Sequence, residues 1–256
     1  MGLNLLKYQG AKQRLAPKII ELMGYPLKYG EPCGGSAAVL LNKTPSRYEY
    51  YNDLDGNLVR FMRVLQSPLK TGKLIRRLSA TLYARAELVA AIKAVSDPVD
   101  EIDFAWGYYC SSRMQRPGGP GFLVSLSSSH NHKPDAVNFR SAVGMIRECM
   151  QRLSNMHIEA NDAVSAILQF DEKDMLHYVD PDYPGESGYA HSVDHAKLVD
   201  TLNSIKGRYI LSSYIECDYS RLEYAHRELI RNRTFNAKKK RTEVLYMNYK
   251  PDGLLF

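Results

Sequence analysis

Short apolar runs that end in polar or glycine-rich turns lie in the first and last parts of the chain. Runs of this length, rich in tyrosine and branched residues, indicate buried strands. The pattern predicts one strand before the glycines at 34 and 35, further strands at 48–51, 158–160, 175–179 and 208–212, and two strands between 228 and 249. Helical spacing predicts helices at about 13–23, after Asp55 and at 193–205, and an apolar helical turn at 37–42.

Between residues 68 and 153 the strand pattern disappears and helical spacing dominates. Helices are predicted at 69–95, at 99–114 and from Pro134 onward, the last with Val143, Ile146, Met150 and Leu153 on one face. Strands that alternate with helices on both sides of this stretch indicate an α/β fold. We therefore predict a catalytic domain formed by residues 1–66 and 154–256, with an inserted domain formed by residues 67–153.

Composition narrows the class of protein. An apolar content of 45% and a charged content of 24% are typical of a soluble globular chain. No apolar run approaches the roughly 18 residues that cross a bilayer, and Met1–Leu6 does not resemble a secretory signal, so a cytoplasmic location is expected. The net charge of +6 raises the expectation of a nucleic-acid partner only modestly. The four cysteines lack the spacing of a zinc site.

Asp180, Pro181 and Tyr183 follow the apolar run 175–179 directly. In open α/β sheets, ligands bind beyond the carboxyl ends of the strands. A carboxylate, a carbonyl in a stiff loop and an aromatic ring at such a place suit a planar substrate that carries an amino group. A plain Asp-Pro turn is the alternative interpretation, and these residues alone do not decide between the two.

Two segments near the N-terminus also carry candidate chemistry. Lys12 lies near the start of the predicted helix, where the helix dipole favours negative groups, so it is expected to meet a carboxylate. A solvated lysine is the alternative. The glycines of segment 31–36 allow a ligand to approach the backbone closely. Because no Gly-Lys-Ser/Thr sequence follows at the required spacing, phosphate binding is not expected.

Acidic residues follow two further predicted strands. Asp53 comes about 20 residues after the glycine loop, a spacing that suits hydrogen bonds to ribose hydroxyls. Asp53 or Asp55 could instead cap the next helix. We expect Asp53 to bind the ribose and Asp55 to start the helix. Asp162 follows the strand predicted at 158–160.

The stretch 113–133 combines glycines, serines and basic residues, which predicts a loop or hairpin. Arg113 and Arg116 could follow phosphates there, while small polar residues reach base edges. An ordinary surface loop is the alternative. The basic turn at 238–241 is usually a solvated feature, but it could also steer DNA toward the protein.

Together these segments resemble, in order and spacing, the motifs of the Dam-like DNA adenine methyltransferases, which use S-adenosylmethionine. Lys7–Lys12 is similar to the aromatic-x-Gly-x-Lys element of that family, and Glu31–Ser36 is similar to its Glu-Pro-Phe-x-Gly-x-Gly loop. Tyr51–Asp53 is similar to its Asn-Asp element, and Asp162 to the acid before its catalytic strand. Asp180–Tyr183 is similar to its Asp-Pro-Pro-Tyr motif, and Ser212–Cys217 to its Ser-Tyr-x-x-Cys element. The matches span residues 7–217. Each motif is weak alone, and their common order makes the resemblance specific.

The resemblance implies an α/β fold with a Rossmann-like, seven-stranded, mostly parallel methyltransferase sheet. It implies that the inserted, mainly helical domain recognises a target in double-stranded DNA. The implied residues for S-adenosylmethionine are Tyr8, Lys12, Glu31, Pro32, Cys33, Gly34, Gly35, Ser36, Asp53, Asp162 and Asp180. The implied residues for DNA are Arg113, Arg116, Ser127, Ser128, Asn131 and Lys133. No metal is needed, because the sulfonium of the cofactor is itself the activated group. A monomer is one expected state, and the sequence leaves the oligomeric state open.

The implied reaction is methyl transfer to the 6-amino group of an adenine that has flipped out of the duplex. Tyr183 would stack on the base, while the Asp180 carboxylate and the Pro181 carbonyl would accept the two amino hydrogens. The amino lone pair is delocalised into the ring and is a poor nucleophile. Two oriented acceptors favour its pyramidal form and stabilise the positive charge that develops during transfer.

Three positions depart from the family pattern. Cys33 replaces the usual phenylalanine, Ser36 stands near the last glycine, and Asp182 replaces the usual proline. If Asp182 points inward, the two neighbouring carboxylates compete for a proton and the acceptor is weakened, so Asp182→Pro is then expected to increase turnover. If Asp182 faces solvent, the cost of the replacement is small, and the sequence leaves this choice open. This departure leaves a catalytically impaired DNA-binding descendant as the alternative function, and the recognised DNA sequence and biological role stay open.

Overall fold

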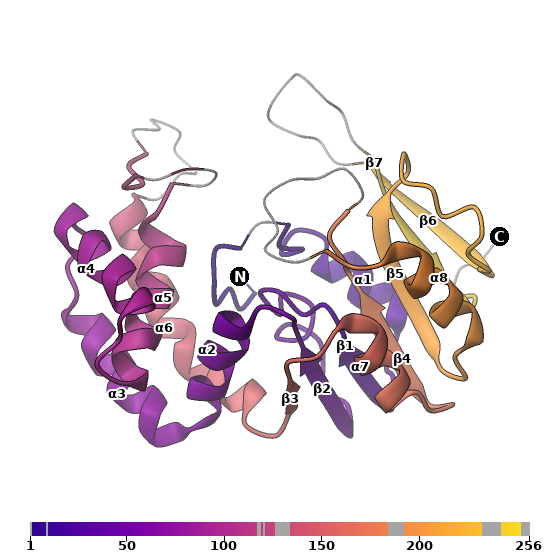
Figure 1. The fold of residues 1–256 in the computed structure, drawn as a ribbon, viewed down its shortest axis with the longest axis horizontal. Helices are drawn as coiled ribbons and strands as arrows, with labels where there is room; N and C mark the ends of the chain where they lie inside the picture. The colour runs from indigo at the N-terminus through magenta and orange to yellow at the C-terminus, as the bar shows by residue number, and fades with distance from the viewer. Residues whose placement is uncertain are drawn as a thin grey trace. The chain divides into compact units, whose positions relative to one another are not determined.

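The computed structural model describes residues 2–8, 10–116, 119, 121–125, 134–183, 192–231 and 242–251, apart from the side chain of Arg231. These residues form two compact units (Figure 1). The sheet unit consists of Leu15–Gly34, Lys43–Gly56 and Met156–Phe256. The helical unit consists of Met1–Arg14, Gly35–Asn42 and Asn57–Asn155.

The sheet unit contains a seven-stranded mixed sheet, as expected. Its strands are β1 (Lys28–Glu31), β2 (Tyr48–Asn52), β3 (His157–Glu159), β4 (Met175–Val179), β5 (Arg208–Tyr214), β6 (His226–Arg231) and β7 (Thr242–Met247). They follow the order β3-β2-β1-β4-β5-β7-β6. Strands β1 to β5 are parallel, and β7 runs antiparallel to both of its neighbours. The sheet is consistent with a Rossmann-like fold. The basic turn predicted at 238–241 lies outside the described residues.

The strand order reverses between β1 and β4. The chain proceeds from β1 outward through β2 to β3, whereas β4 and β5 extend the sheet in the opposite direction. Connections therefore leave the carboxyl ends of β1 and β4 toward different sides. A crevice at such a switch point is the usual ligand site of an open α/β sheet.

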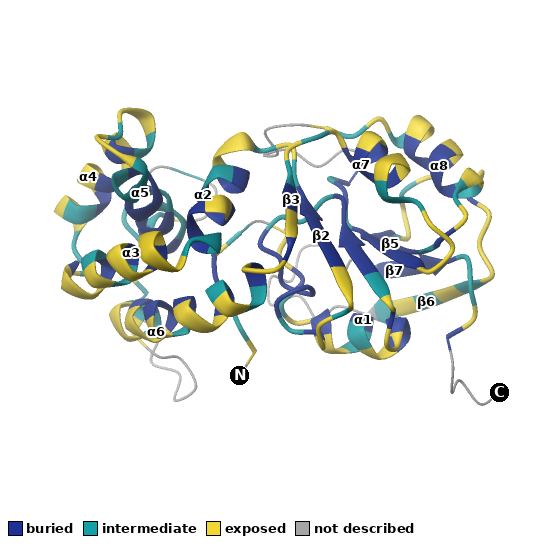
Figure 2. Ribbon diagram, turned by 90° about the horizontal axis from the view of Figure 1, so that it is seen from below, coloured by how far each residue is buried: buried dark blue, intermediate teal, exposed yellow. Residues whose placement is uncertain are grey.

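Helices cover both faces of the sheet. Figure 2 shows α7 (Ala163–Phe170) and α8 (His195–Ser204) along one face and α1 (Ala16–Met23) along the other. A buried cluster joins α7 and α8 to β4, β5 and β7 through residues that include Ile167, Leu198, Val179, Leu211 and Val244. Helix α1 starts three residues later than predicted, with Pro17 in its first turn, where a missing N–H costs nothing.

The helical unit contains α3 (Pro68–Ala80), α4 (Arg85–Ser96), α5 (Glu101–Met114), α6 (Asp135–Leu153) and α2 (Gly56–Gln66) apart from Gly56. The helix predicted at 69–95 is therefore two helices. The break is a tertiary effect, because Trp106 donates a hydrogen bond of 2.8 Å to the Thr81 hydroxyl. Arg140 also donates to the carbonyls of Ser79 and Thr81, each at 2.7 Å, where α3 ends.

One smaller prediction needs correction. Segment 37–42 forms turns rather than an α-helix. The hairpin predicted after α5 is confirmed where it is described, because Gln115 pairs with Phe122 in an antiparallel bridge. Within the described residues, no helix is long and apolar enough to cross a bilayer.

The core of the sheet unit contains a polar pair that spans three strands. Tyr50 on β2 and His177 on β4 are fully buried, and the Tyr50 hydroxyl lies 2.7 Å from Nδ1 of His177. Gly30 on β1 lies between them in the register. A Cβ on Gly30 would lie 1.8 Å from the Tyr50 ring, so only glycine leaves room for this bond.

This pair predicts acid sensitivity of the fold. Burial lowers the pKa of His177 to about 4, from 6.5, and nearby Asp171 opposes the shift only partly. Between these pH values the unfolded chain binds the proton and the folded chain does not, so stability falls as pH falls. Acidification from pH 7 to 4 should lower the unfolding free energy of the wild-type protein by about 3 kcal/mol more than it lowers that of His177→Gln. Urea unfolding of both proteins across pH measures this, and equal pH dependence would contradict it.

Candidate active site

The carboxyl ends of β1 and β4 carry the two loops that the sequence singled out. Glu31 ends β1, and Asp180 follows β4. Because side chains alternate along strands, Glu31 and Tyr178 lie side by side on the face opposite Gly30 and His177. The register that pairs Val179 with Leu211 also places Asp180 beside Ser212. The predicted residues 31–34 and 180–183 therefore meet at the switch point.

A buried polar chain supports Glu31. The Glu31 side chain is 2% exposed and accepts a hydrogen bond of 2.7 Å from the Tyr29 hydroxyl. The Lys43 ammonium lies 4.5 Å from the centroid of the Tyr29 ring and 2.5 Å from the Glu49 carboxylate. Buried carboxylates need such donors, because desolvation without them is costly. Tyr29 thus holds the carboxylate at the end of β1.

Asn52 ties the ends of three parallel strands together. Its side-chain NH₂ donates to the carbonyls of Pro32, at 2.8 Å, and Asn161, at 2.9 Å. Its side-chain oxygen accepts from the N–H of Asn161 at 2.8 Å, and its backbone carbonyl accepts from Gly34. The structural role of Asn52 was not predicted from the sequence. Its partners lie 20 and 109 residues away, so no local pattern could have revealed them.

Gly34 is required by close packing within the same loop. A Cβ on Gly34 would lie 2.1 Å from the Tyr51 ring. The glycine therefore lets the loop lie directly against β2, within reach of the Asn52 carbonyl.

Cys33 lies among the acidic residues of the site. Burial raises the pKa of its thiol well above the ordinary value, and the carboxylates of Asp53, Asp180 and Asp182 raise it further. All three carboxylates act on this one thiol, so the ends of β2 and β4 each place acidic residues in the neighbourhood of Cys33. Cys33 stays a neutral thiol, which is a poor nucleophile, so it lines the site without taking part in covalent chemistry.

Asp53 is half-buried directly after β2. One oxygen of its carboxylate accepts a hydrogen bond of 2.9 Å from the backbone N–H of Asp55. This bond fixes the turn before α2, so Asp53 takes part in starting the helix, a task that the sequence analysis gave to Asp55. The ribose-binding role of Asp53 stays a prediction.

Asp180 is held by a hydrogen bond from Tyr183, which in turn contacts β5. The Tyr183 hydroxyl donates to Oδ1 of Asp180 at 3.1 Å and lies 3.0 Å from the Ser212 hydroxyl. Tyr183 is only 3% exposed, and its ring packs edge-on against Tyr214 with a centroid distance of 4.5 Å. In this arrangement the ring has no open face, so the stacking role that the resemblance implies does not fit it. Pro181 between them is buried.

Asp182 has partners of its own. Its carboxylate accepts a bond of 2.7 Å from the Ser192 hydroxyl and one of 2.9 Å from the backbone N–H of Val193. It therefore links the segment after β4 to the residues before α8. Each oxygen of the Asp182 carboxylate thus accepts a hydrogen bond.

Asp162 caps a helix in this structure. Its carboxylate accepts a bond of 3.0 Å from the backbone N–H of Ser165 in the first turn of α7. Hydrogen bonds from the Ser165 hydroxyl and N–H lower the pKa of Asp162. It stays ionised, and contact with the cofactor amine stays a prediction.

The remaining predicted cofactor residues belong to the helical unit. Gly35 has a φ of 49°, and a Cβ on it would lie 3.3 Å from the Tyr8 ring. Ser36 and Lys12 are buried, and the Lys12 ammonium donates to the carbonyl of Gly10 at 3.0 Å. Helix α1 begins at Ala16, four residues beyond Lys12, so Lys12 does not lie in its first turn.

Arg113 is a correction among the predicted DNA contacts. It lies in the last turn of α5, is 5% exposed, and donates to the backbone and side-chain oxygens of Asn4. A guanidinium buried in this way holds the N-terminal segment and does not meet phosphates. Arg116 is exposed in the hairpin, as expected. Ser127, Ser128, Asn131 and Lys133 lie outside the described residues.

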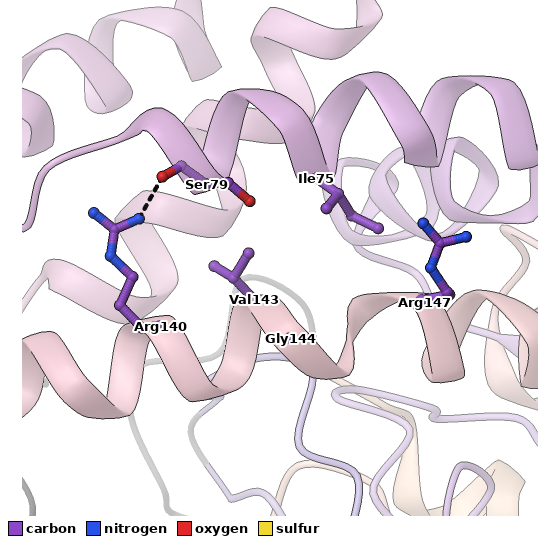
Figure 3. Close-up of a pocket in the computed structure, with 6 residues that line it drawn as sticks. All are labelled: Ile75, Ser79, Arg140, Val143, Gly144 and Arg147. Atoms are coloured by element: carbon purple, nitrogen blue, oxygen red, sulfur yellow. Dashed lines mark hydrogen bonds between the residues drawn. The ribbon is translucent and has the colours of Figure 1, made fainter.

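The helical unit also contains a groove between α3 and α6 (Figure 3). It has a volume of about 320 Å³ and is lined by Ile75, Ser79, Arg140, Val143, Gly144 and Arg147. Arg140 points to the end of α3, where its bonds to carbonyls complete the helix end. This groove contains no acid–base pair and none of the predicted site residues, so the switch point of the sheet remains the candidate active site.

No group of three or more histidine, cysteine or acidic side chains among the described residues is arranged to hold a metal ion. No protein-family model matches the chain, and no curated protein matches it in sequence.

Proposed function

We propose that this chain is a site-specific DNA adenine methyltransferase that transfers a methyl group from S-adenosylmethionine to the 6-amino group of a flipped adenine. One observation carries the proposal. The Glu31–Gly34 loop and the Asp180–Tyr183 segment, matched to different motifs of that family, meet at the topological switch point of a seven-stranded sheet.

The residues at this site fit the cofactor by their chemistry. Asp53 offers a carboxylate to a ribose diol, and the three acids around Cys33 suit a positively charged sulfonium. Gly34, held against Tyr51, presents backbone without a side chain. The cofactor would supply an activated methyl group, and the protein would supply position and charge.

Asp180 and Pro181 would act on the substrate. The Asp180 carboxylate would accept one hydrogen of the adenine amine, and the Pro181 carbonyl would accept the other. Both acceptors belong to a segment anchored at Ser212 and Ser192, so little reorganisation is needed as positive charge develops. The Asp182 departure was the only reason to consider a catalytically impaired descendant. Its bonds to the chain before α8 weaken that alternative.

Transfer of labelled methyl groups from S-adenosylmethionine tests the proposal. Purified protein should label unmethylated double-stranded DNA and leave RNA of matched composition unlabelled. Label in RNA alone would reassign the substrate, and label in neither polymer would overturn the proposal.

Asp53→Ala should weaken the binding of S-adenosylmethionine by roughly 1.5–3 kcal/mol, the usual contribution of a hydrogen bond to a charged group. Asp53→Asn is the matched control, because an amide oxygen can still accept the bond from Asp55 that fixes the turn. Calorimetric titration measures both affinities. Unchanged affinity in the alanine variant would remove Asp53 from the cofactor site.

Arg116→Ala should lower DNA affinity several-fold and reduce its salt dependence by about one counterion, because an exposed arginine in the hairpin is expected to meet a phosphate. Arg147→Ala removes an equally exposed charge from the α3–α6 groove and serves as the control. Titrations at several salt concentrations compare the two. Equal losses would mean that the hairpin makes no particular contact.

A further inference from the structure

Three side chains form a directional hydrogen-bond chain that ends on Asp180. The Tyr183 hydroxyl lies 3.1 Å from Oδ1 of Asp180 and 3.0 Å from the Ser212 hydroxyl. A phenol has a single hydrogen, and an ionised carboxylate can only accept. Tyr183 therefore donates to Asp180, and Ser212 must donate to the oxygen of Tyr183. We call Ser212, Tyr183 and Asp180 the relay.

The relay is protected from solvent at its two donor residues. Ser212 is fully buried on β5, and Tyr183 is 3% exposed. Burial raises the pKa of Tyr183 well above its ordinary value, and Asp180 raises it further, so the phenol keeps its hydrogen. Hydrogen bonds in such surroundings are stronger than in water.

The ring of Tyr183 has a different task from its hydroxyl. Tyr214 packs against it with an interplanar angle of 76°, on the same strand as Ser212. Strand β5 thus holds both parts of the side chain, the ring through Tyr214 and the hydroxyl through Ser212. What Tyr183 offers to the site is a fixed donor rather than an open aromatic face.

We propose that Tyr183 is a positioning residue that works through its hydroxyl, which, set by Ser212, fixes the orientation of the Asp180 carboxylate toward the target amine. The inference rests on the proposed function, because Asp180 acts there as the amine acceptor. It differs from stacking on the base, in which the ring matters and the hydroxyl does not.

Tyr183→Phe separates the two roles, because it removes the hydroxyl and keeps the ring. The relay predicts a kcat about 10- to 100-fold lower, with KM for DNA and for S-adenosylmethionine within about twofold of wild type. Ser212→Ala should lower kcat in the same way. Ser213→Ala is the control, since Ser213 is equally buried on β5 but faces the opposite side of the sheet. A phenylalanine variant with wild-type kcat would overturn the relay.

A measurement without turnover distinguishes failure of the relay from failure of the proposed function. Thermal unfolding midpoints are compared for Tyr183→Phe, Asp180→Ala and the double variant. If the hydroxyl acts through Asp180, the shift of the double variant is smaller than the sum of the two single shifts, because the bond between Tyr183 and Asp180 is lost in both single variants and is counted only once in the double variant. Fully additive shifts would contradict the relay, even if the wild-type protein transferred no methyl group to DNA.

Discussion

Asp180→Ala should abolish methyl transfer and leave the fold intact. The carboxylate is the one ionised acceptor that the proposal aims at the target amine, and removal of a single preorganised electrostatic group commonly costs about 10²–10³ in kcat. Asp180 is only half-buried, so its loss creates no large cavity. The effect should therefore appear in the rate and not in the far-ultraviolet circular dichroism spectrum.

The matched control for this variant is Asp174→Ala. Asp174 is an exposed acid directly before β4, so it lies at the end of that strand away from the site. Single-turnover rates with labelled cofactor compare the two variants with wild type. If Asp180→Ala kept a tenth or more of the wild-type rate, Asp180 would not be the amine acceptor.

Asp182→Pro should lower turnover and stability, contrary to the expectation from the sequence. Proline would restore the family motif, but it would remove the acceptor of the bonds from Ser192 and Val193. Loss of both bonds should cost about 2 kcal/mol of unfolding free energy and reduce kcat about tenfold, because the segment that carries Asp180 loses its anchor.

Asp182→Asn tests the reason for that loss. An amide oxygen can still accept the bond from the Val193 N–H, so this variant should stay closer to wild type in both stability and rate. Chemical unfolding and single-turnover kinetics measure the two quantities. A proline variant that turns over faster than wild type would mean that the bonds to Ser192 and Val193 are dispensable and that proline provides the better loop.

Local patterns in the sequence predicted the parts of the fold that local physics decides. The apolar run 175–179 predicted β4 and therefore the position of Asp180, because five successive buried residues fit only a strand covered on both faces. The break between α3 and α4 had no such signal. It depends on Trp106 and Arg140, which lie 25 and 59 residues from Thr81.

The same limit of local sequence patterns explains which residues of the candidate site could be predicted and which could not. The ends of β1, β2 and β4 could be expected to converge once a parallel sheet was predicted, so Glu31, Asp53 and Asp180 could be predicted to lie at the same edge of the sheet. Arg113 was expected to meet phosphates because it adjoins the basic, glycine- and serine-rich stretch, whereas its bond to Asn4 across 109 residues keeps it buried. The hydrogen bond between Ser212 and Tyr183 joins residues that are 29 positions apart, and it depends on the register of β4 and β5.

Identification of the modified base tests the central claim most directly. DNA from cells that express the wild-type chain is hydrolysed, and its nucleosides are analysed by mass spectrometry beside DNA from cells that express Asp180→Ala. The account predicts N6-methyladenine with the wild-type chain and none above background with the variant. DNA without N6-methyladenine in both, or equal amounts in both, would contradict an adenine methyltransferase that acts through Asp180.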